Sequence, residues 1–349
     1  MGRDGGAKGY HERCVRDPSA VLRRKLLFLL VFAALGAAGG PAPAQRARLP
    51  RIGYMLLGPR VDPPSRERQA FLDGLRELGY VPGRTVEIVY RSAEGEEVFL
   101  DEMYQDLLRQ EIDLIVTSTT ISVLAAKKAT ATIPVVMLAQ GDPVGVGAVR
   151  SLARPEANLT GVSFLSSELA GKRVELLLEC VPAAKRIAVL WNERNRNSVV
   201  ESQAALEAIR ERRARPEALG VASPRGLEDA LARLGRLRPD ALYVAFEGAL
   251  IGSHSALIAQ TGLQQRLPLI SGWSPLTEAG GLLSYAPDLA SMFYRAASYA
   301  SRLLQGAKPS ELPVELATKI DLVVNLKTAR ALGISVPRSI ALRADRILE

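Results

Sequence analysis

Beyond its N-terminal segment, the chain alternates between short apolar runs rich in β-branched residues and longer stretches whose apolar positions recur every three or four residues. The short runs are typical of strands buried in a parallel sheet, and the helical period is typical of the helices that cover one. The helix predicted over 66–78, for example, places Phe71, Gly74, Leu75 and Leu78 on one face. The pattern therefore predicts an α/β fold.

The alternation occurs in two successive series, separated by the segment 161–167. Two series of this length predict two doubly wound lobes, each built on a parallel sheet. The first series has strands at 51–57, 85–90, 113–117 and 134–138, with helices at 66–78, 98–109 and 122–131. The second has helices at 171–180, 198–213, 226–234 and 253–265, with strands at 186–191, 241–246 and 267–270.

The later part of the chain departs from this regular alternation. Residues 215–223 would make a poor strand, because two prolines and a glycine interrupt them. After residue 282 we predict a short strand, a helix over 288–304, and a last strand and helix over 322–332 that cross back between the lobes. This makes a multi-strand hinge. The expected first lobe is 45–163 with about 284–318, and the expected second lobe is 164–283 with about 319–349.

A secretory leader is predicted at the N-terminus. Arg23, Arg24 and Lys25 precede the apolar run 26–38, and Ala42-Pro43-Ala44 supplies small residues before Gln45. A membrane anchor is the alternative, but the run is too short to span a bilayer core of about 30 Å. We therefore expect residues 1–44 to be a cleaved signal peptide and the working chain to be periplasmic or otherwise extracytoplasmic. The arginine pair leaves both the general secretory and the twin-arginine route open.

Charge and residue usage exclude several classes of protein. The leader would remove seven basic and three acidic residues, so the net charge falls from +8 to a mild +4. No basic block with interleaved aromatic residues appears, so we expect no nucleic-acid partner. The processed chain would keep only Cys180 and His254, which excludes an internal disulfide, a Cys/His zinc site and a His-dependent triad. We expect Cys180 to pack in the core.

Catalytic motifs are also missing from the sequence. It contains no G-x-S-x-G elbow and no phosphate-binding G-x-x-x-x-G-K-[ST] loop, and Gly145-Val146-Gly147 lacks the third glycine of a dinucleotide-binding turn. We therefore expect no catalytic residue, no metal and no cofactor.

Candidate ligand-binding residues follow the predicted strands of the first lobe. In open parallel sheets, ligands bind beyond the carboxyl ends of the strands, where loops run into helix N-termini. Ser118, Thr119 and Thr120 follow the third strand and could hold a carboxylate or simply cap the next helix. Asp142 follows the fourth strand and could meet an ammonium group or form an Asx turn.

The second lobe offers Asn195, Glu247 and Trp273 at corresponding positions. A few polar groups with an aromatic ring are typical of a small-molecule pocket. Trp273 could instead be a core aromatic residue, and Glu247 a solvated acid. Arg60 and Arg66, near the first strand end, could reach an acidic ligand or remain solvated.

Several segments resemble one known family. They are Gly-Asp-Pro-Val-Gly at 141–145, Ser-Leu-Ala-Arg-Pro at 151–155, Asn-Leu-Thr-Gly at 158–161, Glu-Leu-Ala-Gly-Lys-Arg at 168–173, and further matches at 76–80, 278–285, 312–314 and 325–329. Together they closely resemble the substrate-binding proteins of ABC transporters whose characterised members include tryptophan and tyrosine binders. The likeness spans nearly all of 51–349.

The resemblance implies a type I periplasmic-binding fold, whose two lobes close on a ligand that then passes to a membrane permease. It also implies that Ser118, Thr119, Thr120, Asp142 and Asn195 lie in ligand-facing loops. The first loop, 58–64, departs from the family's small hydroxyl residues, and Glu193-Arg194 stands where Pro-Ala is common, so the resemblance does not identify the ligand.

We therefore expect a monomeric, exported solute-binding protein that captures an amino acid or a related carboxylate by hinge closure. A sensor subunit that presents its closed form to a receptor is the first alternative, and an α/β enzyme is the second.

Overall fold

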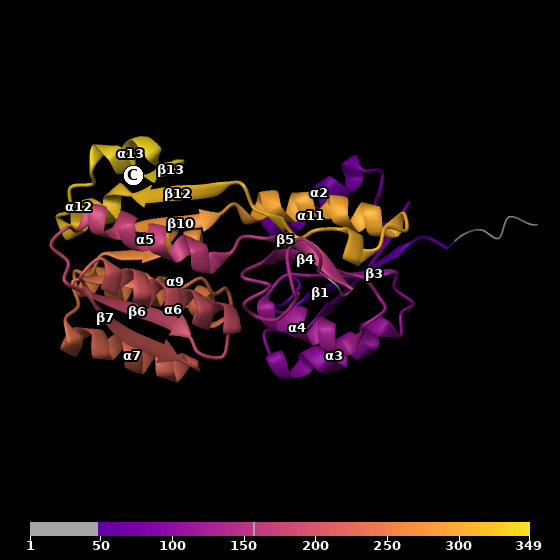
Figure 1. Ribbon diagram of the computed structural model, residues 1–349, viewed down its shortest axis with the longest axis horizontal. Helices are drawn as coiled ribbons and strands as arrows, with labels where there is room; N and C mark the ends of the chain where they lie inside the picture. The colour runs from indigo at the N-terminus through magenta and orange to yellow at the C-terminus, as the bar shows by residue number, and fades with distance from the viewer. Residues whose placement is uncertain (1–47, 156–157) are drawn as a thin grey trace, which may run out of the picture. The chain divides into compact units, whose positions relative to one another are not determined.

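The computed structural model describes residues 48–155 and 158–349, so the predicted leader at 1–44 lies outside the described residues. Two sheets, each covered by helices on both faces, make up residues 49–349 (Figure 1). The predicted α/β class with two doubly wound lobes is confirmed. Within the described ranges, no helix has the length and apolar character needed to cross a membrane.

Six parallel strands form the first sheet. Across the sheet they are β11 (Glu315–Leu316), β5 (Leu159–Ser163), β4 (Val135–Gln140), β3 (Leu114–Thr117), β1 (Arg51–Leu56) and β2 (Glu87–Ser92). Helices α2 (Arg66–Glu77) and α11 (Leu289–Leu304) pack side by side on one face, where Phe71 and Phe293 join the core. The other face is covered by η1 (Glu97–Phe99), α3 (Leu100–Leu108) and α4 (Thr120–Ala129).

The second sheet has seven strands, of which only the pair β10 and β12 is antiparallel. In order they are β13 (Arg346–Leu348), β12 (Ile320–Asn325), β10 (Leu283–Pro287), β9 (Leu269–Ser271), β8 (Ala241–Val244), β6 (Arg186–Asn192) and β7 (Arg215–Val221). One face packs against α5 (Ser166–Cys180), α6 (Arg196–Glu211), α12 (Leu326–Leu332) and α13 (Arg338–Arg343). The other packs against α7 (Pro224–Leu237), α8 (Leu250–Ser253), α9 (Ser255–Gln264) and α10 (Ser274–Glu278).

Three segments of the described chain connect the two sheets. They join β5 to α5, β10 to α11, and β11 to β12, with the short helix η2 (Pro309–Glu311) just before β11. Helix α11 therefore completes the first lobe although it follows most of the second lobe in the chain (Figure 1). The exact lobe boundaries stay a prediction. Because β10 pairs within the second sheet, however, the connection from β10 to α11 follows residue 287, whereas the first lobe was expected to resume at about residue 284.

Two strands correct the expectations from sequence. Residues 215–221 do form a strand, β7, which lies at the edge of its sheet and pairs only with β6. An edge strand tolerates Pro216 because the missing N–H breaks no ladder on its free side. The segment expected to separate the two series, 161–167, overlaps a strand, β5, which lies beside β4. The helix expected over 253–265 is interrupted at His254, so two helices replace one.

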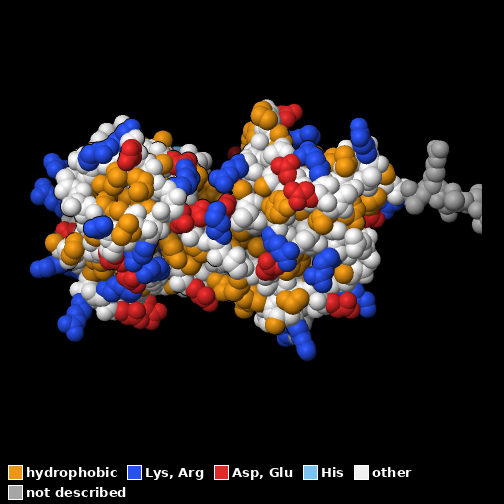
Figure 2. Space-filling view, turned by 90° about the horizontal axis from the view of Figure 1, so that it is seen from above, with side chains coloured by type: hydrophobic (Ala, Val, Ile, Leu, Met, Phe, Trp, Pro, Cys, Tyr) orange, Lys and Arg blue, Asp and Glu red, His pale blue; other side chains and the backbone are white. Residues whose placement is uncertain are grey.

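Basic and acidic side chains are interspersed on the face that Figure 2 shows, with apolar side chains between them. The buried apolar residues instead form four clusters, one on each face of each sheet. The lobes thus have separate cores.

Candidate functional site

A cavity of about 310 Å³, which we call the inner cavity, is lined by loops at the carboxyl ends of strands from both sheets. The first sheet contributes residues after β1 and β3, and the second contributes residues after β6, β8 and β9. Parallel strands place these loops at one edge of each sheet, which explains why distant segments of sequence meet here. Six of the seven predicted ligand-binding residues line it: Ser118, Thr119, Thr120, Asn195, Glu247 and Trp273.

The first lobe presents three hydroxyl groups at the start of α4. Thr119 caps the helix by accepting a hydrogen bond from the Ser122 N–H, and Thr120 Oγ1 accepts one from Gln140 Nε2 at 3.0 Å. Ser118 lines the inner cavity with no hydrogen bond from its hydroxyl to any described residue. Helix capping and cavity lining therefore coexist at this loop.

The second lobe holds its polar side chains more tightly. Asn195 caps α6, since its Oδ1 accepts hydrogen bonds from the N–H groups of Asn197 at 3.0 Å and Ser198 at 3.3 Å. Glu247 is buried, and each of its carboxylate oxygens accepts a backbone N–H, from Ala249 and Ile251, at 2.7 Å. Burial raises the pKa of Glu247. Glu247 is therefore no solvated acid, and it shapes the loop it stands in.

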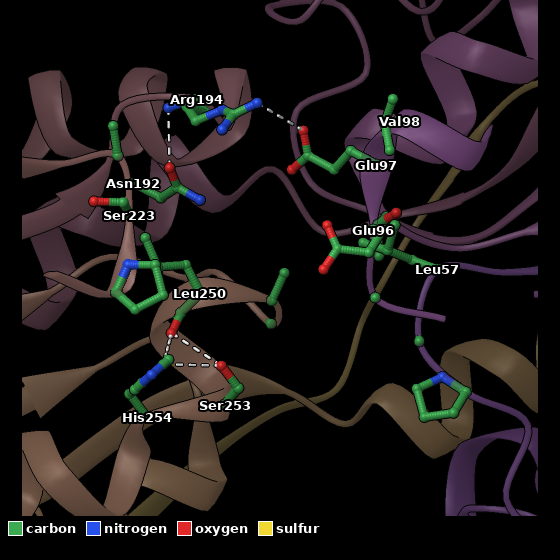
Figure 3. A pocket seen from close by; sticks show the side chains of 18 of the residues that line it. Leu57, Glu96, Glu97, Val98, Asn192, Arg194, Ser223, Leu250, Ser253 and His254 are labelled. Carbon is green, nitrogen blue, oxygen red and sulfur yellow. Dashed lines mark hydrogen bonds and ion pairs between the residues drawn. The ribbon is translucent and has the colours of Figure 1, made fainter. Parts of the chain in front are cut away.

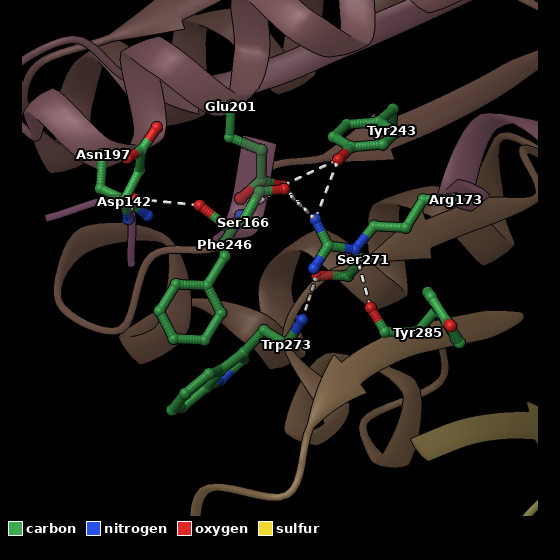
Figure 4. Close-up of polar contacts among 10 residues, drawn as sticks. All are labelled: Asp142, Ser166, Arg173, Asn197, Glu201, Tyr243, Phe246, Ser271, Trp273 and Tyr285. Carbon is green, nitrogen blue, oxygen red and sulfur yellow. Dashed lines mark hydrogen bonds and ion pairs between the residues drawn. The ribbon is translucent and has the colours of Figure 1, made fainter. Parts of the chain in front are cut away.

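Phe246 and Trp273 form an aromatic wall of the inner cavity, and Phe164, which does not line it, packs against Phe246. The rings of Phe164 and Phe246 are 4.8 Å apart and those of Phe246 and Trp273 are 5.4 Å apart, both in edge-to-face contact. Such pairs contribute about 0.5–1.5 kcal/mol beyond the area they bury. Trp273 is only partly buried, and Figure 4 shows its ring next to Phe246. Phe246 was missed as a site residue because the sequence places it at the end of a predicted strand, 241–246, where core packing was expected, whereas the strand ends at Val244.

Asp142 is the predicted residue that the structure places elsewhere. It is not among the residues that line the inner cavity. Its carboxylate accepts hydrogen bonds from the Gly145 N–H, three residues on within the same turn, at 2.9 Å, and from Ser167 Oγ at 3.1 Å. The expected turn role is met, although an Asx turn would bond the N–H two residues on. Its own N–H donates to Asn197 Oδ1 at 2.8 Å. Asp142 thus joins the two lobes beside the cavity, and direct contact with a ligand stays a prediction that this placement does not favour.

The arginines near the first strand behave differently from one another. Arg60 stacks over the Tyr90 ring at 4.2 Å, and Arg66 is largely exposed, 3.7 Å from Asp288. Neither lines the inner cavity. Arg68, which sequence reasoning did not select, is 5% exposed and does line it. Its position three residues before the core residue Phe71 was the available signal, because that spacing turns a helical side chain inward.

A larger cavity of about 710 Å³, the outer cavity, shares Trp273, Thr119 and the 57–59 loop with the inner one. Arg194 from the second lobe and Glu97 from the first face each other here at 3.8 Å (Figure 3). His254 also lines it, and its Nδ1 lies 2.7 Å from the Leu250 carbonyl oxygen. Arg194 therefore places a cation in the lining of the outer cavity.

A buried polar cluster lies behind the aromatic wall (Figure 4). Arg173 and Glu201, both fully buried, form an ion pair at 2.8 Å, and Tyr243 donates to the same Glu201 oxygen at 2.8 Å. Burial acts to lower the pKa of Arg173, but Glu201 and Tyr243 outweigh it and the pKa is raised. The Phe246 N–H also donates to Glu201, at 3.1 Å. The cluster therefore fixes the backbone that carries the aromatic wall.

Cys180 and Glu247, two side chains of types that enzymes use, have structural roles here. Within residues 48–155 and 158–349, no group of three or more His, Cys, Asp or Glu side chains could hold a metal ion. Cys180 is buried, and burial raises the pKa of its thiol to about 12, as expected for a packed residue. The acid in the inner cavity with the most perturbed surroundings, Glu247, has both oxygens engaged by backbone.

Comparison with known proteins places the chain in a family. Residues 61–348 match the model of the ABC transporter substrate binding protein family, so the chain belongs to that family. A tyrosine-binding protein from Clostridioides difficile (strain R20291) is 26% identical over 283 residues, which cover 80% of this chain and 79% of that protein. The family that the sequence resembles is thereby confirmed.

Solved structures give the same result. An ABC domain from Streptococcus pneumonia in complex with L-Trp matches with a TM-score of 0.80 at 26% identity, covering 86% of this chain and all of that one. The leucine-binding protein LivK from Thermotoga maritima, at 15% identity and a TM-score of 0.58, shares the fold over 74% of this chain and 83% of its own. The expected type I periplasmic-binding fold is confirmed. Proteins of this family bind small molecules, are generally extracytoplasmic and work with ABC permeases.

Proposed function

We propose that this chain captures a small solute, an amino acid or a related carboxylate, between its lobes and delivers it to the permease of an ABC uptake transporter. The observation that carries the proposal is the inner cavity. Ser118 and Thr119 reach it from one lobe, and Asn195 and Trp273 reach it from the other. A solute held there contacts both lobes at once.

The size and lining of the inner cavity support a small, partly apolar solute. Its volume of about 310 Å³ lies at the low end of the range usual for ligand pockets. Phe246, Trp273, Leu289 and Phe293 supply an apolar surface, and the hydroxyl groups near Ser118 supply polar contacts. The relatives that bind tyrosine and L-Trp carry solutes of this kind.

Closure of the lobes would bind and release the solute without making or breaking a covalent bond. The ligand favours the closed form only through contacts that the open form lacks. The three crossings between the sheets would serve as the hinge. The proposal also includes export by a leader cleaved before Gln45 and a monomeric state. Its two lobes are 45–163 with about 284–318, and 164–283 with about 319–349.

Tryptophan fluorescence offers a direct test, because the chain has only two tryptophans. Trp273 lines the inner cavity, while Trp191 packs against the core of the second lobe. The Trp191→Phe variant therefore reports on the cavity alone, and Trp273→Phe is its matched control. Native mass spectrometry of protein purified without refolding identifies a bound solute to titrate.

We expect the solute to change the emission of Trp191→Phe saturably and to leave that of Trp273→Phe nearly unchanged. At a hundredfold excess over Kd it should also stabilise the protein by about 2.7 kcal/mol. Chemical conversion of the solute during the titration would contradict a binding function. So would the lack of any co-purified compound together with no stabilisation by amino acids or small organic acids.

A further inference from the structure

The chain buries two arginines among its described residues, and their surroundings differ. Arg173 has Glu201 as its counter-ion at 2.8 Å, with both side chains fully buried. Arg68 is 5% exposed and forms no ion pair with a described residue. Its guanidinium donates a hydrogen bond to the Val61 carbonyl oxygen, and it lies 5.8 Å from the centre of the Tyr90 ring. Arg173 thus has a counter-ion within the protein, and Arg68 has none among the described residues.

The unmatched cation faces the inner cavity. Arg68 stands in the first turn of α2, and its side chain is part of the cavity lining. A guanidinium stays protonated in proteins, and burying a charge without a partner is costly. Water in an empty cavity can offset that cost. A solute that displaces the water offsets the cost best with an anionic group, because hydrogen bonds between two charged groups are about twice as strong as neutral ones.

Two acids also line the inner cavity, and neither neutralises Arg68. Glu247 has both oxygens engaged by the N–H groups of Ala249 and Ile251. Glu67, the neighbour of Arg68 on α2, is partly buried and also borders a separate cavity that includes Arg66 and Asp288. Adjacent helical residues point in different directions, so Glu67 and Arg68 do not face each other.

We propose that Arg68 binds the carboxylate of the solute, which makes the solute class a small carboxylic acid with an apolar body. The planar guanidinium matches a carboxylate through two parallel hydrogen bonds, and Phe246, Trp273 and Phe293 accommodate the apolar part. The inference rests on the proposed solute-binding function and adds the charged group that selects among solutes. An amino acid and a plain organic acid share this carboxylate.

Two matched sets of compounds test the assignment by calorimetry and thermal shift. The indole set is L-tryptophan, indole-3-propionate and tryptamine, and the phenyl set is L-phenylalanine, 3-phenylpropionate and phenethylamine. The carboxylate-bearing members should bind and the amines should not. If the ammonium group adds nothing, the plain acids will bind as well as the amino acids.

Variants of residues on α2 then separate the contribution of Arg68 from that of the other groups in the cavity. Arg68→Gln should weaken the carboxylates at least tenfold, while Arg68→Lys, which keeps the charge, should recover part of that loss. Arg66→Gln removes the same charge from an exposed position outside the inner cavity and should change affinity less than twofold. Circular dichroism and the Tm of each variant separate lost binding from lost folding.

Several results would overturn the assignment. Amines that bind as tightly as the acids would refute it, as would Arg68→Gln with unchanged affinity or Arg66→Gln with an equal loss. A co-purified solute without an anionic group would refute the role of Arg68 and leave solute capture standing. No binding of any of the six compounds, with nothing co-purified, would instead contradict the proposed function.

Discussion

Replacing Glu201 by Gln should lower the free energy of unfolding by about 3–5 kcal/mol, because it leaves Arg173 as an unmatched charge in the core of the second lobe. Both side chains are fully buried, and the Arg173 Nη1 to Glu201 Oε1 distance is 2.8 Å. At an effective dielectric constant of about 20, two unit charges at that separation attract by about 6 kcal/mol. The desolvation cost of the pair offsets part of that attraction, which gives the smaller expected value.

The geometry of the cluster adds to the expected loss. Glu201 Oε1 accepts hydrogen bonds from Arg173, from Tyr243 and from the Phe246 N–H. In contrast, Glu201 Oε2 and Arg173 Nη2 are buried without a protein partner. Because the cluster is incomplete, an apolar pair of similar size should be tolerated. The double variant Arg173→Met with Glu201→Leu should regain most of the stability that Glu201→Gln loses.

Urea unfolding followed by circular dichroism and by tryptophan fluorescence measures these differences. Glu207→Gln is the matched control, since Glu207 lies on the same helix and is exposed, and it should stay within about 0.5 kcal/mol of the parent. A loss below about 1 kcal/mol for Glu201→Gln would refute the electrostatic argument. A double variant no more stable than the single one would refute the claim that the unmatched charge causes the loss.

Three further predictions follow from other parts of the fold. Arg194→Ala should speed solute release by no more than about fivefold in stopped-flow measurements, because the partly exposed pair between Arg194 and Glu97 contributes only about 0–1 kcal/mol. The effect should vanish at high salt, and a larger, salt-independent effect would contradict this. Gly161→Ala should lower the free energy of unfolding in urea by more than about 1 kcal/mol. Gly161 has φ 137°, and an added Cβ would lie 2.2 Å from the Met137 carbonyl oxygen. An unchanged midpoint of urea unfolding would show that the strand adjusts. Cys180, whose thiol pKa is raised to about 12, should resist a disulfide reagent at pH 8 until urea unfolds the chain, and rapid labelling of the native protein would contradict its burial.

Much of the fold could be predicted from the sequence because the hydrophobic period carries it. The face of α2 is one example, since Phe71, Gly74 and Leu75 are all buried as expected. Leu78, expected on the same face, is exposed because the helix ends at Glu77. The strand β5 could not be predicted in the same way. It is five residues long and contains Gly161 in a conformation that other residues rarely adopt, so its pairing with β4 depends on tertiary contacts.

The candidate site also has residues that the sequence pattern could identify and residues whose role depends on tertiary contacts. Ser118, Asn195 and Trp273 could be selected because they follow predicted strands, and topology alone brings such positions together. Arg68 could not be selected, because its spacing from Phe71, which turns it inward, is also found in any ordinary amphipathic helix. Asp142 shows the converse: a strand-end acid can satisfy a turn and a neighbouring helix, and sequence cannot tell which partner it finds.

Closure around a solute is the central claim, and small-angle X-ray scattering tests it most directly. The chain from Gln45 onward is measured alone and with the compound, among the six named above or recovered by co-purification, that raises the Tm most. Calorimetry under the same conditions establishes saturation. The radius of gyration should fall on saturation, because the ligand draws the two lobes together. An unchanged radius of gyration at full occupancy would contradict capture by closure.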